Sequence, residues 1–195
     1  HKCDSIMADD INYLDRNEFN FEPSPEVVKA IKDFDVNKLC FYTRLYDEGK
    51  KSIFSIALAE DYGVDESQVV LGYGAEDILT QAVHFFLTET PGRNTMLIPQ
   101  YSWWYYQSIA DEVDGRTLQY SVNEEEDGFA YDFEALRRSI EEHQPKVVLV
   151  ASPNNPTGNG LTPDELDRLG QFTPTDTIIL VDEAYASFVT GDVSY

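Results

Sequence analysis

Apolar and polar residues follow one another along this chain in blocks that predict strands and helices in turn. The strongest apolar run is Val147–Ala151, a β-branched stretch that stops at the proline-containing segment 152–158. A second run, at residues 178–181, stops at Asp182. Such continuous runs are typical of strands buried in a parallel sheet. Because ligands bind outside the carboxyl ends of such strands, the residues after these two runs are the first candidates for chemistry.

The rest of the chain continues this alternation. Shorter apolar runs predict three more strands, at residues 69–71, 95–98 and 117–122, and an acidic connection follows the last of them. Apolar residues at helical spacing predict helices, and the clearest start signals are Ser24-Pro25-Glu26, Asp132 and the capping box Thr162-Pro163-Asp164-Glu165. Gly63 is the expected end of a helix that includes Ile53 to Tyr62.

These elements together predict the fold class. Repeated β-α-β units with right-handed crossovers build an α/β three-layer sandwich, in which helices cover both faces of a mainly parallel sheet. The first 21 residues have no sustained period, and we interpret them as a mobile or partner-clasping arm. The chain stops 14 residues after the strand at 178–181. This ending leaves a sheet edge exposed, so we expect either a fragment or a domain that relies on further sequence.

Composition and charge narrow the partners. The chain of 195 residues carries 36 acidic against 14 basic side chains, a net charge of −22. Such a field repels phosphodiester backbones and anionic membranes, so neither nucleic acid nor a membrane is an expected partner. Because the carboxylates are dispersed, we attribute the acidity to solubility or a salty habitat rather than to an acidic tail. Any anionic ligand must then be held by local donors.

Two cysteines, Cys3 and Cys40, lack the spacing of a disulfide framework or of a zinc site, so we expect free thiols and no bound metal. No apolar segment is long enough to span a bilayer, and the amino end has no signal-type apolar core. We therefore expect a cytoplasmic protein.

Two glycine-rich or aromatic segments follow predicted strands, and each has two readings. The segment 71–77, LGYGAED, combines free backbone N–H groups with the positive end of a helix, which suits a phosphate, but an ordinary tight turn has the same spacing. It is neither a Walker loop nor a dinucleotide fingerprint. The aromatic burst at 99–106, PQYSWWYY, suits either simple core packing or stacking on a flat heteroaromatic cofactor.

The two segments at the strongest strands are more specific. In SPNNPTG, residues 152–158, the prolines fix the backbone and hold Asn155 as a rigid hydrogen-bond donor, although a surface turn remains the alternative. Asp182 ends an apolar run, where a carboxylate is costly unless it is paired. A cationic ring nitrogen would be such a partner, and Tyr185 would reach the same ligand. The alternative is an aspartate that caps a helix or meets an arginine.

These segments, in this order on successive strand ends, resemble the pyridoxal-phosphate-dependent aminotransferases of fold type I, in the class I/II branch around histidinol-phosphate aminotransferase. The resemblance extends from NEFNFEPSPEVVKAI through RLYDEG, GYGAED and PQYSWW to SPNNPTG and DEAY. It implies an N-terminal arm and part of a small domain in residues 1–40, and a large cofactor-binding domain, incomplete, in residues 41–195. It also implies a homodimer that takes amino acid and 2-oxo acid substrates.

The resemblance assigns roles residue by residue. Backbone donors at Gly74, Ala75 and Glu76 would hold the cofactor phosphate, and Tyr101 would stack on the pyridine. Asn155 and Tyr185 would bind the phenolic oxygen, Asp182 would pair with the pyridinium nitrogen, and Tyr46 would reach the phosphate of the neighbouring subunit. The pairing of Asp182 with the pyridinium nitrogen would keep the ring protonated, and a protonated ring draws electrons from the substrate α-carbon. The order Glu76-Asp77 reverses the acidic pair that is common in the family.

The catalytic lysine, which forms the Schiff base in this family, and two arginines, for the phosphate and for the substrate carboxylate, match no position in the chain. We therefore expect residues 1–195 to be inactive alone. The leading hypothesis is an aminotransferase, acting on a histidinol-phosphate-like or aromatic amino acid. The alternatives are a decarboxylase of amino acid phosphates with the same fold, and a non-catalytic scaffold.

Overall fold

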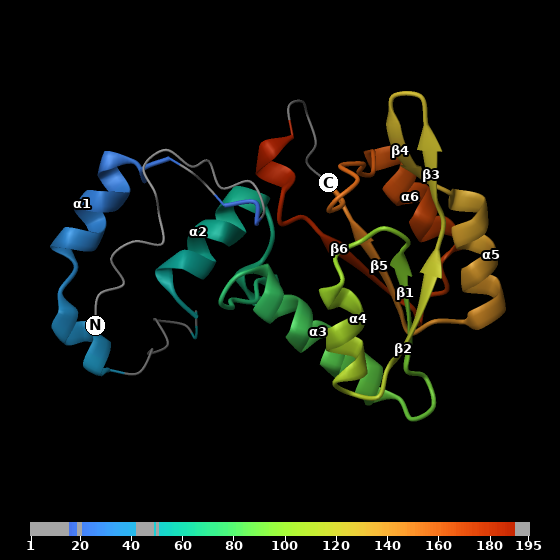
Figure 1. Ribbon diagram of the computed structural model, residues 1–195. Helices are drawn as coiled ribbons and strands as arrows, with labels where there is room; N and C mark the ends of the chain where they lie inside the picture. The colour runs from blue at the N-terminus through green and yellow to red at the C-terminus, as the bar shows by residue number, and fades with distance from the viewer. Residues whose placement is uncertain (1–15, 19–20, 42–48, 50, 190–195) are drawn as a thin grey trace, which may run out of the picture. The chain divides into compact units, whose positions relative to one another are not determined.

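The computed structural model of the chain describes residues 16–18, 21–41, 49 and 51–189 (Figure 1). The chain divides into two compact units, His1–Ile56 and Ala57–Tyr195. The division predicted near residue 40 stays a prediction, and most of the predicted arm lies outside the described residues.

The first unit contains one well-capped helix, α1 (Pro25–Asp33). Ser24 is its N-cap and its side chain accepts a hydrogen bond from the backbone of Val27, while Pro25 occupies the first helical position, as the sequence predicts. A short 3₁₀ helix, Val36–Cys40, follows, and the thiol of Cys40 is free and exposed. The helix α2 (Ile53–Tyr62) begins in this unit and continues into the second, and it ends at Gly63, whose φ of 64° is the left-handed conformation expected of a glycine C-cap.

The second unit is built on a sheet of four parallel strands in the order β2-β1-β5-β6. The strands are β1 (Thr95–Pro99), β2 (Arg116–Tyr120), β5 (Val147–Ala151) and β6 (Ile178–Asp182). All five residues of β5 are buried, because this strand is central and both of its faces are covered. The register places Ala151 beside Asp182, so the two strongest apolar runs end side by side.

Helices cover both faces of this sheet, as Figure 1 shows. On one face α3 (Ala75–Glu89) and α4 (Tyr105–Asp111) pack on Met96, Val147 and Leu149. On the other face α5 (Phe133–His143) and α6 (Pro163–Phe172) pack on Leu97, Val148 and Val150. Successive residues of β1 and β5 thus serve opposite faces, which is the two-residue period of a strand. The α/β three-layer architecture with a mainly parallel sheet is therefore confirmed.

Two start signals are also confirmed. The side chain of Asp132 accepts from the backbone of Ala135 at the start of α5. At α6, Thr162 and Glu165 form the reciprocal capping box that the sequence predicts.

The prediction of a strand at residues 69–71 is wrong. A 3₁₀ helix, Glu66–Gln68, precedes these residues, and the backbone N–H of Val69 donates to its Glu66 carbonyl rather than to a neighbouring strand. The side chain of Val70 is 64% exposed. A run of only three residues, with its first N–H already used, offers too few ladder bonds to form a strand.

The prediction at residues 117–122 is partly wrong. The strand β2 ends at Tyr120, and Val122 begins an antiparallel hairpin of β3 (Val122–Glu125) and β4 (Gly128–Tyr131). The acidic connection therefore contains structure of its own. Its signal is the turn dipeptide Asp127-Gly128, in which Asp127 belongs to the turn and Gly128, with φ 150°, begins β4.

Candidate functional site

The candidate residues gather where the sheet reverses its direction of growth. The chain passes from β1 to β2 on one side of the sheet and from β5 to β6 on the other, so β1 and β5 flank a topological switch point. Their carboxyl ends are followed by Tyr101 and by the loop 152–161. In open α/β sheets the crevice at this point is the usual ligand position.

A side chain that the sequence reasoning did not single out joins the two loops at this edge. Asn154 is 3% exposed, and its Nδ2 donates to the Tyr101 carbonyl at 3.0 Å and to Thr157 Oγ1 at 2.6 Å. Its backbone N–H donates to the Asn159 carbonyl at 2.7 Å. The loop after β5 is therefore closed on itself and tied to the loop after β1. Asn155, the predicted donor, is half-buried beside it.

The base of the same loop is tied to β6. The hydroxyl of Ser152, which is buried, accepts from the backbone of Leu161 at 2.9 Å, and the Ser152 N–H donates to the Asp182 carbonyl at 2.9 Å. A Cβ on Gly160 would lie 2.7 Å from Ser152 Oγ, so a side chain at 160 would disturb this closure. The rigidity that the sequence predicts for 152–158 thus comes from a hydrogen-bond network as well as from proline.

Tyr101 has an unusual backbone for its residue type. Its φ is 54°, in the left-handed region that is uncommon outside glycine, asparagine and aspartate. The bond from Asn154 to its carbonyl holds this conformation, and its ring is 54% exposed. Strained backbone at a strand end is a frequent feature of binding sites. An exposed aromatic ring in a fixed position suits stacking rather than core packing.

Asp182 ends β6 as a carboxylate that is 9% exposed. Its Oδ2 accepts from the hydroxyl of Tyr106 at 2.6 Å, and its Oδ1 accepts from the backbone of Ala184 at 3.0 Å. No arginine, lysine or histidine of the described residues pairs with it. Burial and the negative charge of Asp182 raise the pKa of the Tyr106 hydroxyl.

In the sequence Tyr106 stands out only as part of the aromatic burst at 99–106, and its bond to Asp182 was not predicted. Its position gives the available signal, since it lies in the first turn of the helix that follows Tyr101 and is 2% exposed. Tyr185 is half-buried on the turn after β6, with its ring centroid 6.5 Å from that of Phe188. Burial, followed by the charge of Asp182, raises the pKa of Glu183 on the same turn.

The predicted phosphate site lies at the start of α3. Gly74 is the N-cap with φ 85°, it supplies no side-chain cap, and a Cβ there would meet nothing within 4 Å. Ala75 and Glu76 open the helix and are exposed. Asp77, rather than Glu76, fixes the loop, because its Oδ2 accepts from the Tyr73 N–H at 2.9 Å and this bond lowers the pKa of Asp77.

The structure brings some of the predicted residues together more directly than others. Hydrogen bonds join the loop of Tyr101 to the loop of Asn155, and the base of that loop to Asp182. The start of α3 is joined to them through Thr80, whose Oγ1 lies 3.4 Å from the Tyr105 hydroxyl at the start of α4. Tyr46 lies outside the described residues.

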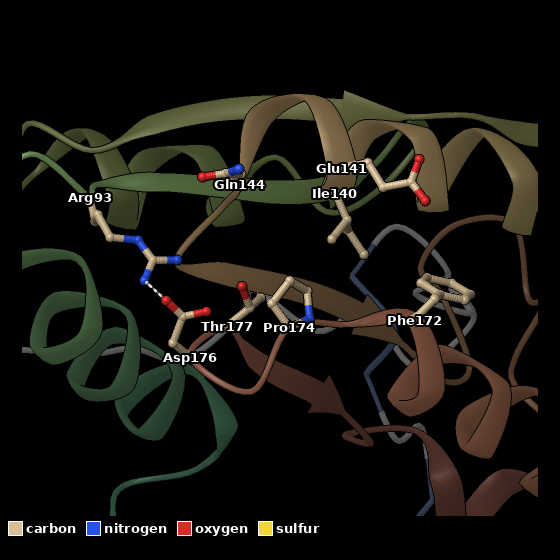
Figure 2. A pocket seen from close by; sticks show the side chains of 8 residues that line it. All are labelled: Arg93, Ile140, Glu141, Gln144, Phe172, Pro174, Asp176 and Thr177. Carbon is tan, nitrogen blue, oxygen red and sulfur yellow. Dashed lines mark hydrogen bonds and ion pairs between the residues drawn. The ribbon is translucent and has the colours of Figure 1, made fainter.

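The opposite, amino-terminal edge of the sheet contains a pocket of about 400 Å³ (Figure 2). Figure 2 shows Arg93 directed at Asp176, with the apolar side chains of Ile140, Pro174 and Phe172 also lining the pocket. The lining residues are Arg93, Ile140, Glu141, Gln144, Phe172, Pro174, Asp176 and Thr177. None of the predicted site residues lines it.

Lys146 also belongs to the amino-terminal edge. Its backbone N–H donates to the Thr95 carbonyl, and its Nζ pairs with Glu89 Oε2 at 2.9 Å. The β5 strand separates it from the candidate site by roughly 16 Å, at about 3.3 Å per residue. It therefore cannot reach a ligand at the carboxyl edge.

The described residues include no helix that is long and apolar enough to cross a membrane.

The described geometry defines what the carboxyl edge can bind. Asp182 offers a negative charge without a described cationic partner, Tyr101 offers an aromatic face, and the start of α3 offers uncapped backbone donors. A flat ligand with a cationic ring and an anionic group matches this set.

Comparisons with known proteins bear on the fold and the family of the chain. A histidinol-phosphate aminotransferase of Shouchella clausii is 34% identical over 177 residues, which is 90% of this chain and 44% of that protein. The structure of the Sinorhizobium meliloti histidinol-phosphate aminotransferase in complex with pyridoxal 5′-phosphate superposes with a TM-score of 0.71 at 21% identity, over 90% of this chain and 44% of that one. A decarboxylase of Sulfurospirillum multivorans superposes with a TM-score of 0.63 at 20% identity, over 86% and 43%.

The two structural likenesses establish the fold, and the chain spans less than half the length of these proteins. The model of one family, aminotransferase class I and II, matches residues 9–195. Because this match covers almost the whole sequence, the chain belongs to the class I and II aminotransferase family.

Proposed function

We propose that the chain supplies part of a pyridoxal-phosphate site in an enzyme that moves an amino group between an amino acid and a 2-oxo acid. The observation that carries the proposal is Asp182, a buried carboxylate at the switch-point edge whose described donors are all neutral. Such a charge is costly unless a cation binds to it. The protonated ring nitrogen of this cofactor is a cation of suitable shape.

The residues of this edge fit the cofactor group by group. Asp182 would hold a proton at the ring nitrogen, and Tyr101 would cover one face of the ring. Asn155 and Tyr185 would bind the phenolic oxygen, and the backbone of Gly74, Ala75 and Glu76 would hold the phosphate. The open space at Gly74 and the uncapped first turn of α3 support this last assignment.

The chemistry divides between the cofactor and the chain. When bound, pyridoxal phosphate supplies an electron sink for the bonds of the substrate α-carbon. The negative charge of Asp182 would keep the ring nitrogen protonated and so strengthen that sink. Two hydrogen bonds hold the loop 152–161: Asn154 donates to the Tyr101 carbonyl, and Leu161 donates to Ser152 Oγ. Asn155, which lies in this loop, would therefore keep a fixed position toward the cofactor.

The whole protein requires groups that match no position in residues 1–195. These are the catalytic lysine and the two arginines of the family pattern.

We infer a homodimer in which Tyr46 reaches the neighbouring subunit's phosphate site. We also infer that residues 1–40 form an arm with part of a small domain, and that residues 41–195 belong to the large domain. A histidinol-phosphate-like or aromatic amino acid is the proposed substrate class.

The test uses the protein expressed from its complete gene. It is titrated with pyridoxal phosphate and then incubated with histidinol phosphate or phenylalanine and 2-oxoglutarate. We expect cofactor binding, a change in the visible absorbance on addition of the amino donor, and formation of glutamate. Release of carbon dioxide without a new oxo acid would identify a decarboxylase instead. Failure to bind the cofactor at saturating concentration would overturn the proposal and favour a scaffold.

A further inference from the structure

We propose that Tyr106 is a positioning residue for the Asp182 carboxylate and that it acts on the cofactor through Asp182. This inference rests on the proposed function, since it deepens the role of the same site. The sequence motifs described above assign no task to Tyr106. The contact that suggests one is the 2.6 Å bond from the Tyr106 hydroxyl to Asp182 Oδ2.

This bond is set by the fold rather than by local sequence. It joins residues 76 positions apart, one in the first turn of α4 and the other at the end of β6. The Tyr106 side chain is 2% exposed, and the edge of its ring contacts Trp103 at a centroid distance of 5.7 Å with an interplanar angle of 84°. A ring packed in this way has little freedom to turn, so the direction of its hydroxyl is fixed.

The carboxylate is held at both oxygens. Ala184 donates its backbone N–H to Oδ1 at 3.0 Å, while Tyr106 donates to Oδ2. A carboxylate has about four lone-pair positions, so two remain for another donor. The two bonds fix the plane of the carboxylate, and the remaining lone pairs are therefore presented in a fixed direction. A ring nitrogen that carries a proton is the donor that the proposed function supplies.

Tyr106 is also a permanent donor. Burial and the neighbouring charge of Asp182 raise the pKa of its hydroxyl, so it keeps its proton throughout the neutral and moderately alkaline range. Hydrogen bonds to charged groups are stronger than those between neutral groups. The negative charge on Asp182 is thus stabilised by a group that neither titrates nor competes as a cation, and it stays available to the ligand.

A purely structural role would be shared by a buried tyrosine that makes no bond to Asp182, such as Tyr120 in β2. Tyr120 is 1% exposed and donates its hydroxyl to the Leu149 carbonyl at 3.0 Å, with no bond to Asp182 among the described contacts. Replacing either tyrosine by phenylalanine removes one buried hydrogen bond and keeps the ring. Tyr120→Phe is therefore the matched control for Tyr106→Phe.

The experiment measures the dissociation constant of pyridoxal phosphate from the complete protein, together with the pH dependence of the visible absorbance of the bound cofactor. We expect Tyr106→Phe to weaken binding about tenfold, in line with a lost bond to a charged group, and to shift the absorbance profile along the pH axis. We expect Tyr120→Phe to bind within about twofold of wild type. The shift in the pH profile is a readout that a loss of stability alone would not produce.

A double-variant cycle tests whether the effect passes through Asp182. In an Asp182→Asn background, adding Tyr106→Phe is expected to change the dissociation constant by no more than about twofold. The inference is overturned if Tyr106→Phe behaves like Tyr120→Phe, or if its effect persists in the Asp182→Asn background. Should Tyr106→Phe fail to fold, 3-fluorotyrosine at position 106 keeps the shape and makes the hydroxyl more acidic, and an unchanged absorbance profile then overturns the inference.

Failure of the proposed function gives a different result. A wild-type protein that binds no pyridoxal phosphate overturns the proposed function and this inference together. A wild-type protein that binds it, with the two tyrosine variants indistinguishable, overturns this inference alone.

Discussion

The two edges of the parallel sheet use charge in opposite ways. At the amino-terminal edge the strands begin among paired charges. Lys146 Nζ lies 2.9 Å from Glu89, and Arg93 pairs with Asp176 and donates to the Pro145 carbonyl. Thr177, also at this edge, donates its hydroxyl to the same carbonyl at 2.8 Å. Each of these two cations is therefore paired with an anion.

The carboxyl-terminal edge keeps polar groups that lack such partners. Asp182 accepts only neutral donors among the described contacts. Within the part of the chain that the structure describes, Asn154 Oδ1 and Asn159 Nδ2 are buried without a hydrogen-bond partner. Buried polar atoms are nearly always bonded in native proteins, so such exceptions need an explanation. A ligand at this edge, or ordered water, is the physical explanation.

The difference between the edges separates two kinds of polar residue that look alike in a sequence. Charges at the amino edge stabilise the fold by pairing, whereas Asp182 at the carboxyl edge carries a cost that binding would offset. Substitutions at the two edges should therefore divide cleanly between stability and activity.

Asp182→Asn is expected to give the largest effect. Amino transfer by the complete protein should fall by about 100-fold or more, the usual cost of removing a charge or donor aimed at the reacting group. The free energy of unfolding of the cofactor-free protein should change by less than about 1 kcal/mol, because asparagine still accepts from Ala184 and no cation is stranded. Steady-state kinetics and urea unfolding measure the two quantities.

A large loss of stability in Asp182→Asn would contradict the difference between the two edges. A loss of about 3–5 kcal/mol on unfolding is the cost of removing one partner of a buried ion pair. That result would mean that Asp182 has a cationic partner outside the described residues, and the two edges would then be alike.

Lys146→Ala is expected to reverse the pattern at the amino edge. The variant removes a side chain that is 10% exposed together with its bond to Glu89, and it should lower the free energy of unfolding by about 2 kcal/mol, mostly through lost packing of the stem. Lys146→Met keeps the stem and should recover most of that loss. Both variants should bind pyridoxal phosphate as wild type does. Weaker cofactor binding by Lys146→Met would show that charge at this edge reaches the site.

The sequence could predict the carboxyl edge because its main signals are local. The apolar run of β5 and the acid at the end of β6 are read directly from neighbouring residues, and the parallel register then places Ala151 beside Asp182. The start signals at Ser24 and Thr162 are local too, since a cap involves only the next three residues. Each of these predictions depends on contacts within one element or between adjacent strands.

The contacts that hold the candidate site together were beyond sequence reasoning because they join distant segments. The bond from Asn154 to Tyr101 spans 53 positions, and that from Tyr106 to Asp182 spans 76. In neither pair do the residue types or their spacing in the sequence predict the contact. The strand predicted at 69–71 failed for the converse reason, since three apolar residues satisfy the local pattern while the backbone of Val69 is already bonded to Glu66.

Glu183→Gln is expected to give the smallest effect. It tests whether a second carboxylate of the carboxyl edge, next to Asp182, also lowers the stability of the folded protein. Burial, and then the charge of Asp182, raises the pKa of Glu183 in the folded protein. The folded state therefore binds the proton more tightly than the unfolded state, and its stability falls as the pH rises from about 4 through the raised pKa. Glutamine removes this fall in stability, so the free energy of unfolding of the variant should exceed that of wild type by a few tenths of a kcal/mol at pH 7, an amount limited by solvent screening.

The gain should shrink toward pH 4 and should be smaller in an Asp182→Asn background. Chemical unfolding of the cofactor-free protein at the two pH values measures it. A variant that is less stable than wild type at pH 7 would place Glu183 with the paired charges of the amino edge, and the contrast would then be confined to Asp182.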